Sequence, residues 1–329
     1  MAKSENQKLK LLYIYKILCE ETDENHCIST KDLISRLERY SIKAERKSIY
    51  TDIQSLIDFG YAIEKNNRKT DGGYYLKKRD FETAELKLMA DAISASKFIT
   101  KEQSKKLIDK LEKMACIHDA KKIKRQVFVA NRIKTSNESV FDNADVIHNA
   151  IALNKQISFR YFEWTIDKKM QFRKNGGRYV VSPWAVTVNA ENYYLIAYDA
   201  ENEMIKHYRI DKMKDIEAVD DKRQGKDFFV SFDVADYANK QFGMFSGEEQ
   251  PVTIQFPNHL IGVVLDRFGT QIVTRQRDDA HFSVRANLQV SPQLFGWLAG
   301  MGSDVKILMP ESVKNEYKTY LMNIIENSD

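Results

Sequence analysis

Several cations stand close to tyrosines between residues 160 and 212 of this 329-residue sequence. Guanidinium and ammonium groups bind phosphate, and a tyrosine ring offers a face on which a base can stack. The pattern therefore predicts a site for a nucleotide or a single-stranded nucleic acid. The alternative is that both tyrosines belong to the core and the cations are surface charges. The candidate residues are Arg160, Arg178, Tyr193, Tyr194, His207, Arg209 and Lys212.

A β-hairpin is expected at the centre of this site. Residues 192–199 and 206–213 are rich in tyrosine and isoleucine, which favours strands, and the polar residues 199–202 between them predict a turn. Successive side chains of a strand point to opposite faces, so one of Tyr193 and Tyr194 has to point inward. We expect Tyr194 to be the core residue.

Arg209 is the expected centre of anion binding. In a strand that continues through this region, Tyr208 and Ile210 share one face and Arg209 lies on the other. Arg209 should then point outward, near Tyr193 and Lys212. On this view Arg209→Ala removes an anion contact and leaves the fold largely intact.

A second group of polar side chains shares one face of a helix predicted over residues 45–60, which Gly60 ends. The apolar stripe expected to face the core is Ile49, Ile53, Leu56 and Ile57. The polar face holds Arg46, Lys47, Tyr50, Thr51 and Gln54. An α-helix fits the major groove of DNA, where such side chains reach phosphates and base edges. The face predicts contact with double-stranded DNA; the alternative is an ordinary solvated face.

The elements around this helix support the DNA-binding interpretation. A helix over residues 8–20 and a short helix capped by Ser29 precede it. Two short strands follow at residues 61–64 and 73–76. Three helices and a two-stranded wing predict a winged helix-turn-helix domain. The basic loop between the strands supplies two further candidate DNA contacts, Arg68 and Lys69.

Three stretches resemble known families. Residues 193–195, Tyr-Tyr-Leu, resemble the Trp-Tyr-Leu signature of WYL-domain proteins, and residues 209–212, Arg-Ile-Asp-Lys, are similar to their Arg-x-Asp-Arg segment. Lys212 keeps the charge of the second arginine without its planar fork. Residues 46–53 resemble the recognition helix of DeoR-like regulators. The resemblance implies an Sm/SH3-like barrel that senses a ligand behind a DNA-binding domain.

The C-terminal part of the sequence has its own pattern. From residue 252 the expected elements follow the order β-α-β-β-α-β, which is typical of a ferredoxin-like fold. Residues 295–302 and Pro310 resemble the C-terminal extension that follows many WYL domains. We expect this domain to support a homodimer, because two-fold proteins read inverted repeats through paired half-sites.

The sequence thus predicts an α+β protein with several domains. They are a winged helix-turn-helix domain over residues 1–80, a helical connector over 81–136, a ligand-sensing barrel over 137–222 and a ferredoxin-like domain over 223–329. The composition is ordinary for a globular protein, with 43% hydrophobic and 30% charged residues. The net charge of +4 is small, so DNA binding has to depend on locally clustered cations.

Other functional classes find little support. The sequence has no phosphate-binding glycine loop, no Gly-x-Ser-x-Gly and no His-Glu-x-x-His. His26 and Cys27 have no second ligand at metal spacing, and the other cysteines, Cys19 and Cys116, fit reduced thiols. We therefore expect no catalytic residue, no metal site and no cofactor. Without a recognisable signal peptide or membrane-length apolar run, we expect a cytoplasmic protein with no membrane partner.

These observations predict a ligand-responsive transcriptional regulator. The helical domain binds double-stranded operator DNA, and the barrel senses a nucleotide or a single-stranded nucleic-acid effector. Two other classes stay open: an accessory protein that binds single-stranded DNA or RNA, for example in phage defence, and, with less support, a nucleotide-processing enzyme. Binding to a specific duplex site would favour the regulator. Tight binding of single strands without a specific duplex site would favour the accessory protein, and turnover of a nucleotide would favour the enzyme.

Overall fold

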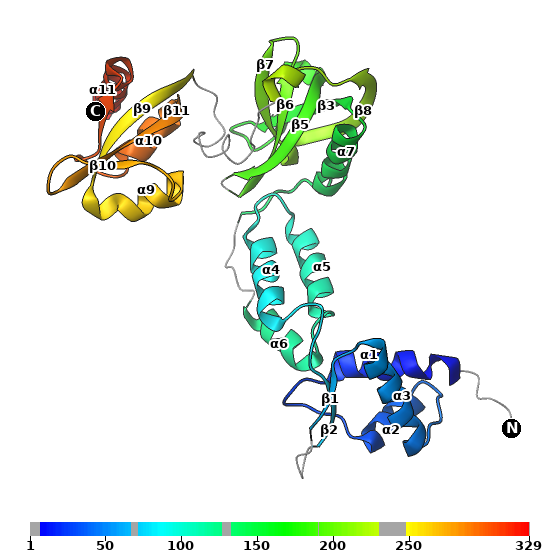
Figure 1. Cartoon of the computed structure of the whole chain (residues 1–329). Coiled ribbons are helices and arrows are strands. Elements are labelled where there is room, and N and C mark those ends of the chain that lie inside the picture. The colour runs from blue at the N-terminus through cyan, green and yellow to red at the C-terminus, as the bar shows by residue number, and fades with distance from the viewer. Residues whose placement is uncertain (1–6, 67–71, 127–132, 190, 230–247, 329) are drawn as a thin grey trace. The chain divides into compact units, whose positions relative to one another are not determined.

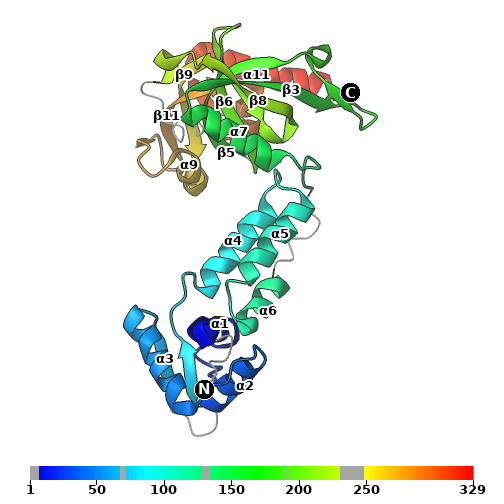
Figure 2. The same cartoon turned by 90° about the vertical axis from the view of Figure 1, so that its right-hand side faces the viewer.

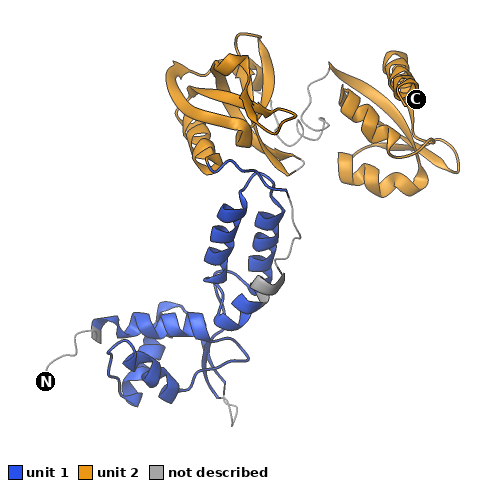
Figure 3. Cartoon of the chain, turned by 180° about the vertical axis from the view of Figure 1, so that it is seen from behind, with its two compact units in different colours: residues 1–138 blue, residues 139–329 orange. Residues whose placement is uncertain are grey.

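The computed structural model describes residues 7–66, 72–126, 133–189, 191–229 and 248–328 (Figure 1). The chain forms two compact units, residues 1–138 and 139–329, which Figure 3 distinguishes by colour. In the described part of the chain, the first unit consists of helices and a two-stranded sheet. The second unit contains two antiparallel sheets, each with helices. The protein is therefore a mixed α/β protein.

Three helices and a β-hairpin begin the first unit. They are α1 (Lys10–Glu21), α2 (Thr30–Glu38), α3 (Arg46–Phe59), β1 (Ile63–Asn66) and β2 (Gly73–Leu76). The predicted stripe of α3 is buried at Ile49, Ile53 and Leu56. Ile57 is 37% exposed, so its place in the stripe was wrong. Ile57 lies about 100° around the helix from Leu56, at the edge of the buried stripe.

The ends of these elements follow local sequence signals. The Ser29 hydroxyl accepts a hydrogen bond from the Asp32 N–H at 3.1 Å and caps α2 as predicted. Gly60 ends α3 with a φ of 116°, a conformation that favours glycine. Backbone hydrogen bonds of 2.9 and 2.8 Å join Ile28 and Tyr74, so β2 is held against the loop before α2.

Three more helices complete the first unit: α4 (Thr83–Ala95), α5 (Lys101–Glu112) and α6 (Ile117–Gln126). Helices α4 and α5 lie side by side in both views (Figures 1 and 2). A capping box between Thr100 and Gln103 is present at the start of α5, where the Thr-x-x-Gln spacing of the sequence favours it. The sequence did not predict α6, which has few apolar residues. Its Ile123 is fully buried in a cluster with Leu86 of α4.

A curled antiparallel sheet begins the second unit after helix α7 (Val140–Ala152). Its strands are β3 (Lys155–Trp164), β4 (Met170–Phe172), β5 (Tyr179–Asn189), β6 (Asn192–Asp199), β7 (Met204–Arg209) and β8 (Met213–Lys222). They pair in the order β4-β3-β5-β6-β7, and β8 returns to pair with β3. Four rings pack together with centroid separations of 5.1 to 6.3 Å: Phe159, Tyr161, Tyr179 and Tyr208.

Strand β7 ends at Arg209, which corrects the prediction of one strand to residue 213. Ile210–Lys212 form a 3-10 turn (η3) before β8 begins. The buried side-chain amide of Asn143 on α7 donates to the carbonyls of Ile210 and Met213 at 3.2 and 3.1 Å. These bonds supply donors for carbonyls that face away from water. Helix α7 therefore holds the turn in place.

The segment after β8 packs on β5 and β6. The Trp184 indole N–H donates to the Gln224 carbonyl at 2.9 Å, and the Trp184 ring stacks on Phe229 with a centroid separation of 4.7 Å. Gly225 has a φ of 79°, and a side chain there would collide with the Tyr198 ring. The contacts of the curled sheet thus extend past residue 222, where the sequence analysis ended this domain.

A four-stranded antiparallel sheet forms the C-terminal part, with strand order β10-β11-β9-β12. The elements are β9 (Glu248–Pro257), α9 (Ile261–Phe268), β10 (Thr274–Gln276), β11 (His281–Val290), α10 (Pro292–Ala299), β12 (Lys306–Met309) and α11 (Glu311–Glu326). Their order along the chain agrees with the predicted sequence of elements. Ile254, Phe256 and Val284 lie in the core of this part. Among the described residues, no helix has the length and apolar character of a membrane span.

We predict that Asn143→Ala destabilises the curled-sheet domain by about 2–6 kcal/mol, because two buried carbonyls lose their donor at about 1–3 kcal/mol each. Urea unfolding measures the change. Asn149→Ala, at an exposed position on the same helix, is the control and should stay within about 0.5 kcal/mol of the parent. Equal effects of the two substitutions would show that Asn143 does not hold the turn.

Candidate functional site

Arg209 and Asp211 form a bidentate ion pair where β7 ends. The Nε and Nη2 atoms of Arg209 donate to the two Asp211 carboxylate oxygens at 3.0 and 2.8 Å. The Asp211 side chain is 7% exposed and that of Arg209 is 31% exposed. Burial lowers the pKa of Arg209, but the hydrogen bond with Asp211 and the charge of that carboxylate raise it. The net result is a raised pKa for Arg209. The Arg209 guanidinium stays charged, and only two of its five N–H groups donate to Asp211.

The register of the β-hairpin places Tyr194, and not Tyr193, opposite Arg209. Tyr194 is half-buried; burial raises its pKa, and the charge of Arg209 acts against that rise. Tyr193 lies on the other face, where its hydroxyl is 3.3 Å from the His148 Nε2 atom on α7. The expected neighbour of Arg209 is therefore corrected: the ring beside it belongs to the tyrosine that we had expected in the core.

His207 precedes Arg209 by two positions on β7 and pairs with Ile196. Residues two positions apart on a strand share a face, so half-buried His207 lies on the same face as Arg209 and Tyr194. Lys212 follows in the turn. Burial lowers the pKa of Lys212, and the charge of Arg209 lowers it further. The structure therefore brings four predicted residues together at one end of the hairpin.

Arg173 adds a cation that the sequence analysis missed. Its guanidinium lies 5.8 Å from the centre of the Tyr161 ring and donates to Glu163 at 2.8 Å. The Arg173 backbone N–H donates to the Tyr161 carbonyl at 2.8 Å, and the charge of Arg173 contributes to the lowered pKa of Lys212. The basic stretch between β4 and β5 was the available sequence signal. We call the set Arg173, Tyr194, His207, Arg209 and Lys212 the Arg209 site.

Tyr161 joins the Arg209 site to the core. Its hydroxyl accepts a hydrogen bond from the Arg209 backbone N–H at 3.1 Å, and its ring packs edge-on against Phe159 and Tyr208. Burial raises the pKa of Tyr161 to about 12. The phenol is therefore neutral at ordinary pH and anchors the backbone at the end of β7.

Arg160 and Arg178 belong to a separate cluster. Strand alternation puts Arg160 on the opposite face of β3 from Tyr161. The Arg160 Nε atom donates to the Asp215 carboxylate at 2.6 Å, and the Arg178 Nη2 atom lies 2.7 Å from the Glu217 carboxylate. The predicted ligand site is thus divided, and these two arginines pair with acids of β8 away from Arg209.

In the first unit, Arg46 and Tyr50 border a depression of about 630 Å³ between the starts of α2 and α3 and the β1–β2 hairpin. The Arg46 Nε atom donates to the Tyr50 hydroxyl at 2.6 Å, and hydrogen bonds from Arg46 and Thr30 lower the pKa of Tyr50. The described lining residues include the cations Lys31, Arg46 and Lys65 and no carboxylate. The depression therefore suits an anion.

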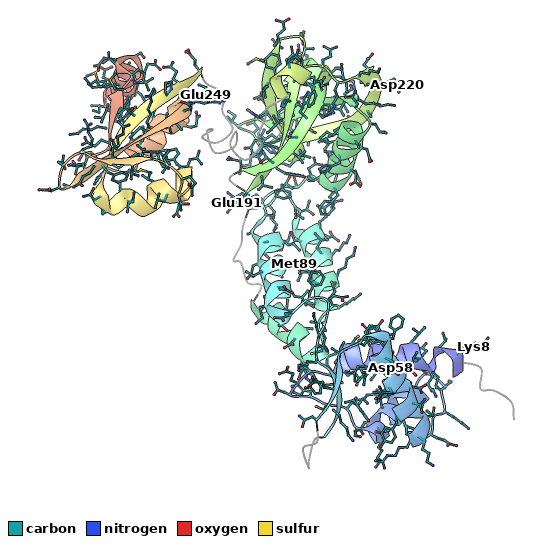
Figure 4. The ribbon with its side chains drawn as sticks, viewed as in Figure 1. Lys8, Asp58, Met89, Glu191, Asp220 and Glu249 are labelled. Carbon is teal, nitrogen blue, oxygen red and sulfur yellow. The ribbon has the colours of Figure 1, made fainter. Side chains whose placement is uncertain are left out.

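The other predicted residues of α3 are exposed. Gln54 donates to the Asp58 carboxylate at 2.8 Å; Figure 4 labels Asp58 near the end of this helix. The Thr51 hydroxyl donates to the Lys47 carbonyl at 3.3 Å. Lys47, Thr51 and Gln54 thus lie along the polar face that the sequence predicted. The two candidate DNA contacts Arg68 and Lys69 lie outside the described residues.

Comparison with known families assigns the second unit. Residues 142–218 match the WYL domain, and residues 248–324 match the WCX domain. The chain thus contains a WYL domain followed by a WCX domain. A WYL domain followed by a WCX domain is the architecture of WYL-domain transcriptional regulators. The Arg209 site lies in the curled sheet of the WYL domain, and the four-stranded sheet lies in the WCX domain.

Two solved structures share a more distant likeness with this WYL-domain protein. Proteasome accessory factor B/C of Arthrobacter aurescens has 15% identity and a TM-score of 0.29, over 100% of this chain and 50% of that one. A CRISPR Cas-related protein has 11% identity and a TM-score of 0.36, over 90% of this chain and 77% of that one. The chain thus spans half the length of the first structure. No curated protein matches the sequence.

The ion pair changes the expected effect of Arg209→Ala. We predict a loss of stability of about 3 kcal/mol, because Asp211 loses its counter-ion in a place that water hardly reaches. Urea unfolding measures the loss. The double variant Arg209→Met with Asp211→Asn should recover most of it, since no charge then remains uncompensated. A double variant as unstable as Arg209→Ala would mean that the uncompensated charge of Asp211 is not the cause of the loss.

Proposed function

We propose that this WYL-domain protein is a ligand-responsive, DNA-binding transcriptional regulator. The observation that carries the proposal is the tandem of WYL and WCX domains behind an N-terminal unit whose helix α3 presents an exposed polar face. The protein acts by binding and not by catalysis, and it needs no cofactor. It works in the cytoplasm as a homodimer on double-stranded operator DNA.

The first three helices and the β1–β2 hairpin act as the winged helix-turn-helix domain in this proposal. Helix α3 enters the major groove, where Thr51 and Gln54 reach base edges. Lys31, Arg46 and Lys65 line the depression beside it and hold backbone phosphates. Phosphate contacts give affinity for any duplex, and the base contacts add the preference for one sequence.

The Arg209 site is the proposed effector site. Phosphate oxygens of a nucleotide or single-stranded nucleic acid bind Lys212, Arg173 and the Arg209 N–H groups that Asp211 does not use. Tyr194 offers the ring on which a base stacks. The cations around this turn outnumber the two carboxylates paired with them, Asp211 and Glu163, so the site favours an anion.

An effector can regulate DNA binding only if its affinity differs between two states of the protein. We propose that residues 81–136 connect the DNA-binding domain to the Sm/SH3-like WYL barrel and transmit the change between these two states. The WCX domain, as a ferredoxin-like module, holds two chains together. A fixed dimer sets the spacing of two half-sites, which predicts an inverted-repeat operator.

We predict that Gln54→Ala changes the preferred DNA sequence and costs about 1–3 kcal/mol at the operator if Gln54 makes a base contact. Arg46→Ala should weaken all duplexes and reduce the salt dependence of binding. Both effects are measured by gel shifts over a range of salt concentrations. Lys16→Ala, an exposed lysine on α1, is the control and should leave binding unchanged.

The operator for these measurements comes from selecting genomic fragments that the purified protein binds. Recovery of fragments with a common inverted repeat supports the proposed function. Unchanged operator affinity in both α3 variants would remove this helix from the DNA interface. If the protein binds single strands tightly and selects no specific duplex, its function is single-strand binding and not regulation at an operator.

We predict that Lys212→Ala weakens effector binding by about 1.5–3 kcal/mol, the value of a hydrogen bond to a charged group. Lys212 is the better probe than Arg209, because its removal leaves the Arg209–Asp211 pair in place. Calorimetry with oligonucleotides and nucleotides measures the affinity, and gel shifts test that DNA binding without effector is retained. Lys155→Ala, which removes a surface pair with Asp220, serves as the charge-matched control. Equal effector affinity in both variants would exclude Lys212 from the site.

A further inference from the structure

Three side chains of types that can ligate a metal converge in the first unit. Asp23 lies between α1 and α2, whereas Cys116 and Asp119 lie at the start of α6. One oxygen of each carboxylate and the Cys116 sulfur lie within 4.8 Å of one another. Cys116 is 1% exposed, and the two aspartates are half-buried. The group therefore combines one thiol and two carboxylates in a partly enclosed place.

Local structure explains how these donors come together. Cys116 directly precedes α6, and its carbonyl accepts the first hydrogen bonds of that helix from Asp119 and Ala120. Residues three positions apart in a helical turn lie on the same side, so Cys116 and Asp119 face one another. Asp23 is fixed by its own turn, in which its carboxylate accepts the backbone N–H groups of Asn25 and His26 at 2.7 and 2.9 Å.

The separation between two of the donors, Cys116 and Asp23, fits a small divalent ion. The Cys116 sulfur is 3.5 Å from the Asp23 Oδ2 atom. A tetrahedral zinc ion with a sulfur at about 2.3 Å and an oxygen at about 2.1 Å separates those two atoms by about 3.6 Å. Without an ion, the same distance is bridged by the weak S–H donor of the cysteine. An ion that replaces this proton would need little rearrangement of the two residues.

The surroundings supply orienting groups. The His26 Nδ1 atom is 2.8 Å from the Asp23 Oδ1 atom, and the His26 ring stacks on His118 of α6 with a centroid separation of 3.6 Å. The Thr83 hydroxyl donates to the Asp119 Oδ2 atom at 2.7 Å. Carboxylate and imidazole partners of this kind commonly fix metal ligands in protein sites.

The positive charge nearby is already engaged. Arg79 acts electrostatically on Cys116, but its guanidinium donates to the backbone carbonyls of Cys19, Thr22 and Leu76. Lys77 donates to Glu64 at 2.7 Å. Both side chains are thus bound to groups outside the cluster.

We propose that Asp23, Cys116 and Asp119 bind one divalent transition-metal ion of the zinc type. The thiolate selects against magnesium and calcium, and the carboxylates suit a borderline ion such as Zn²⁺ or Co²⁺. Three protein ligands leave the fourth tetrahedral position to water. The ion ties the α1–α2 loop to α6, and so fixes the connector helices on the DNA-binding helices. We expected no metal from the sequence, because Asp23 lies 93 positions before Cys116 along the chain and the three donors form no motif.

Titration of the full-length protein with Co²⁺ tests the site directly. Binding of one ion per chain with a sulfur-to-cobalt charge-transfer band in the near ultraviolet is expected, and Zn²⁺ should displace the cobalt. Cys116→Ser, which keeps the shape of the side chain, should abolish the band and weaken binding at least tenfold. Asp119→Asn should weaken binding and keep a weaker band. Cys19→Ser is the matched control and should behave like the parent protein.

Unfolding in the presence and absence of Zn²⁺ provides a second readout. Zinc should raise the midpoint of the parent and of Cys19→Ser but not that of Cys116→Ser, and all three should unfold alike in a chelator. A charge-transfer band that persists in Cys116→Ser would overturn the proposal, as would a parent protein that binds no Co²⁺ at micromolar concentration. Neither result depends on DNA binding, so the test is separate from that of the regulator function.

Discussion

The bidentate pair between Arg209 and Asp211 is the interaction on which the WYL part of the structure depends. Asp211 is almost fully removed from water and lies in a turn, so its charge needs a partner within the same few residues. Such a pair contributes little net stability, but losing one partner leaves an expensive uncompensated charge. The pair therefore selects one conformation of the turn. That conformation ends β7 at Arg209 and places Lys212 and Tyr194 around the guanidinium.

Neutral groups complete this arrangement from two sides. Asn143 holds the turn from helix α7, and the Tyr161 hydroxyl accepts the backbone N–H of Arg209. Because these anchors carry no charge, they position the cations without neutralising them. The charge of Arg173 lowers the pKa of Lys212, so the two cations act on one another. The WYL domain thus presents a preorganised positive site on rigid elements, which is the condition for recognising a phosphate with little reorganisation.

The first unit keeps its polar side chains ordered in a different way. On α3, Arg46 pairs with Tyr50 and Gln54 with Asp58, each four positions apart and therefore on one helix face. These contacts are exposed and weak, so a DNA backbone or base can replace them at small cost. Asp23, Cys116 and Asp119 differ from these exposed pairs. They come together from the α1–α2 loop and the start of α6, and they are partly enclosed.

The sequence by itself determined the features that depend on a few neighbouring residues. The Ser29 cap, the Thr100 capping box, the end of α3 at Gly60 and the order of elements in the WCX domain all follow from such local signals. Tertiary structure alone decided which tyrosine faces Arg209, because strand register depends on pairing between β6 and β7. It also ended β7 early, through an amide 67 positions away, and separated Arg160 and Arg178 from the Arg209 site. These outcomes depend on contacts between distant segments, which local propensity does not encode.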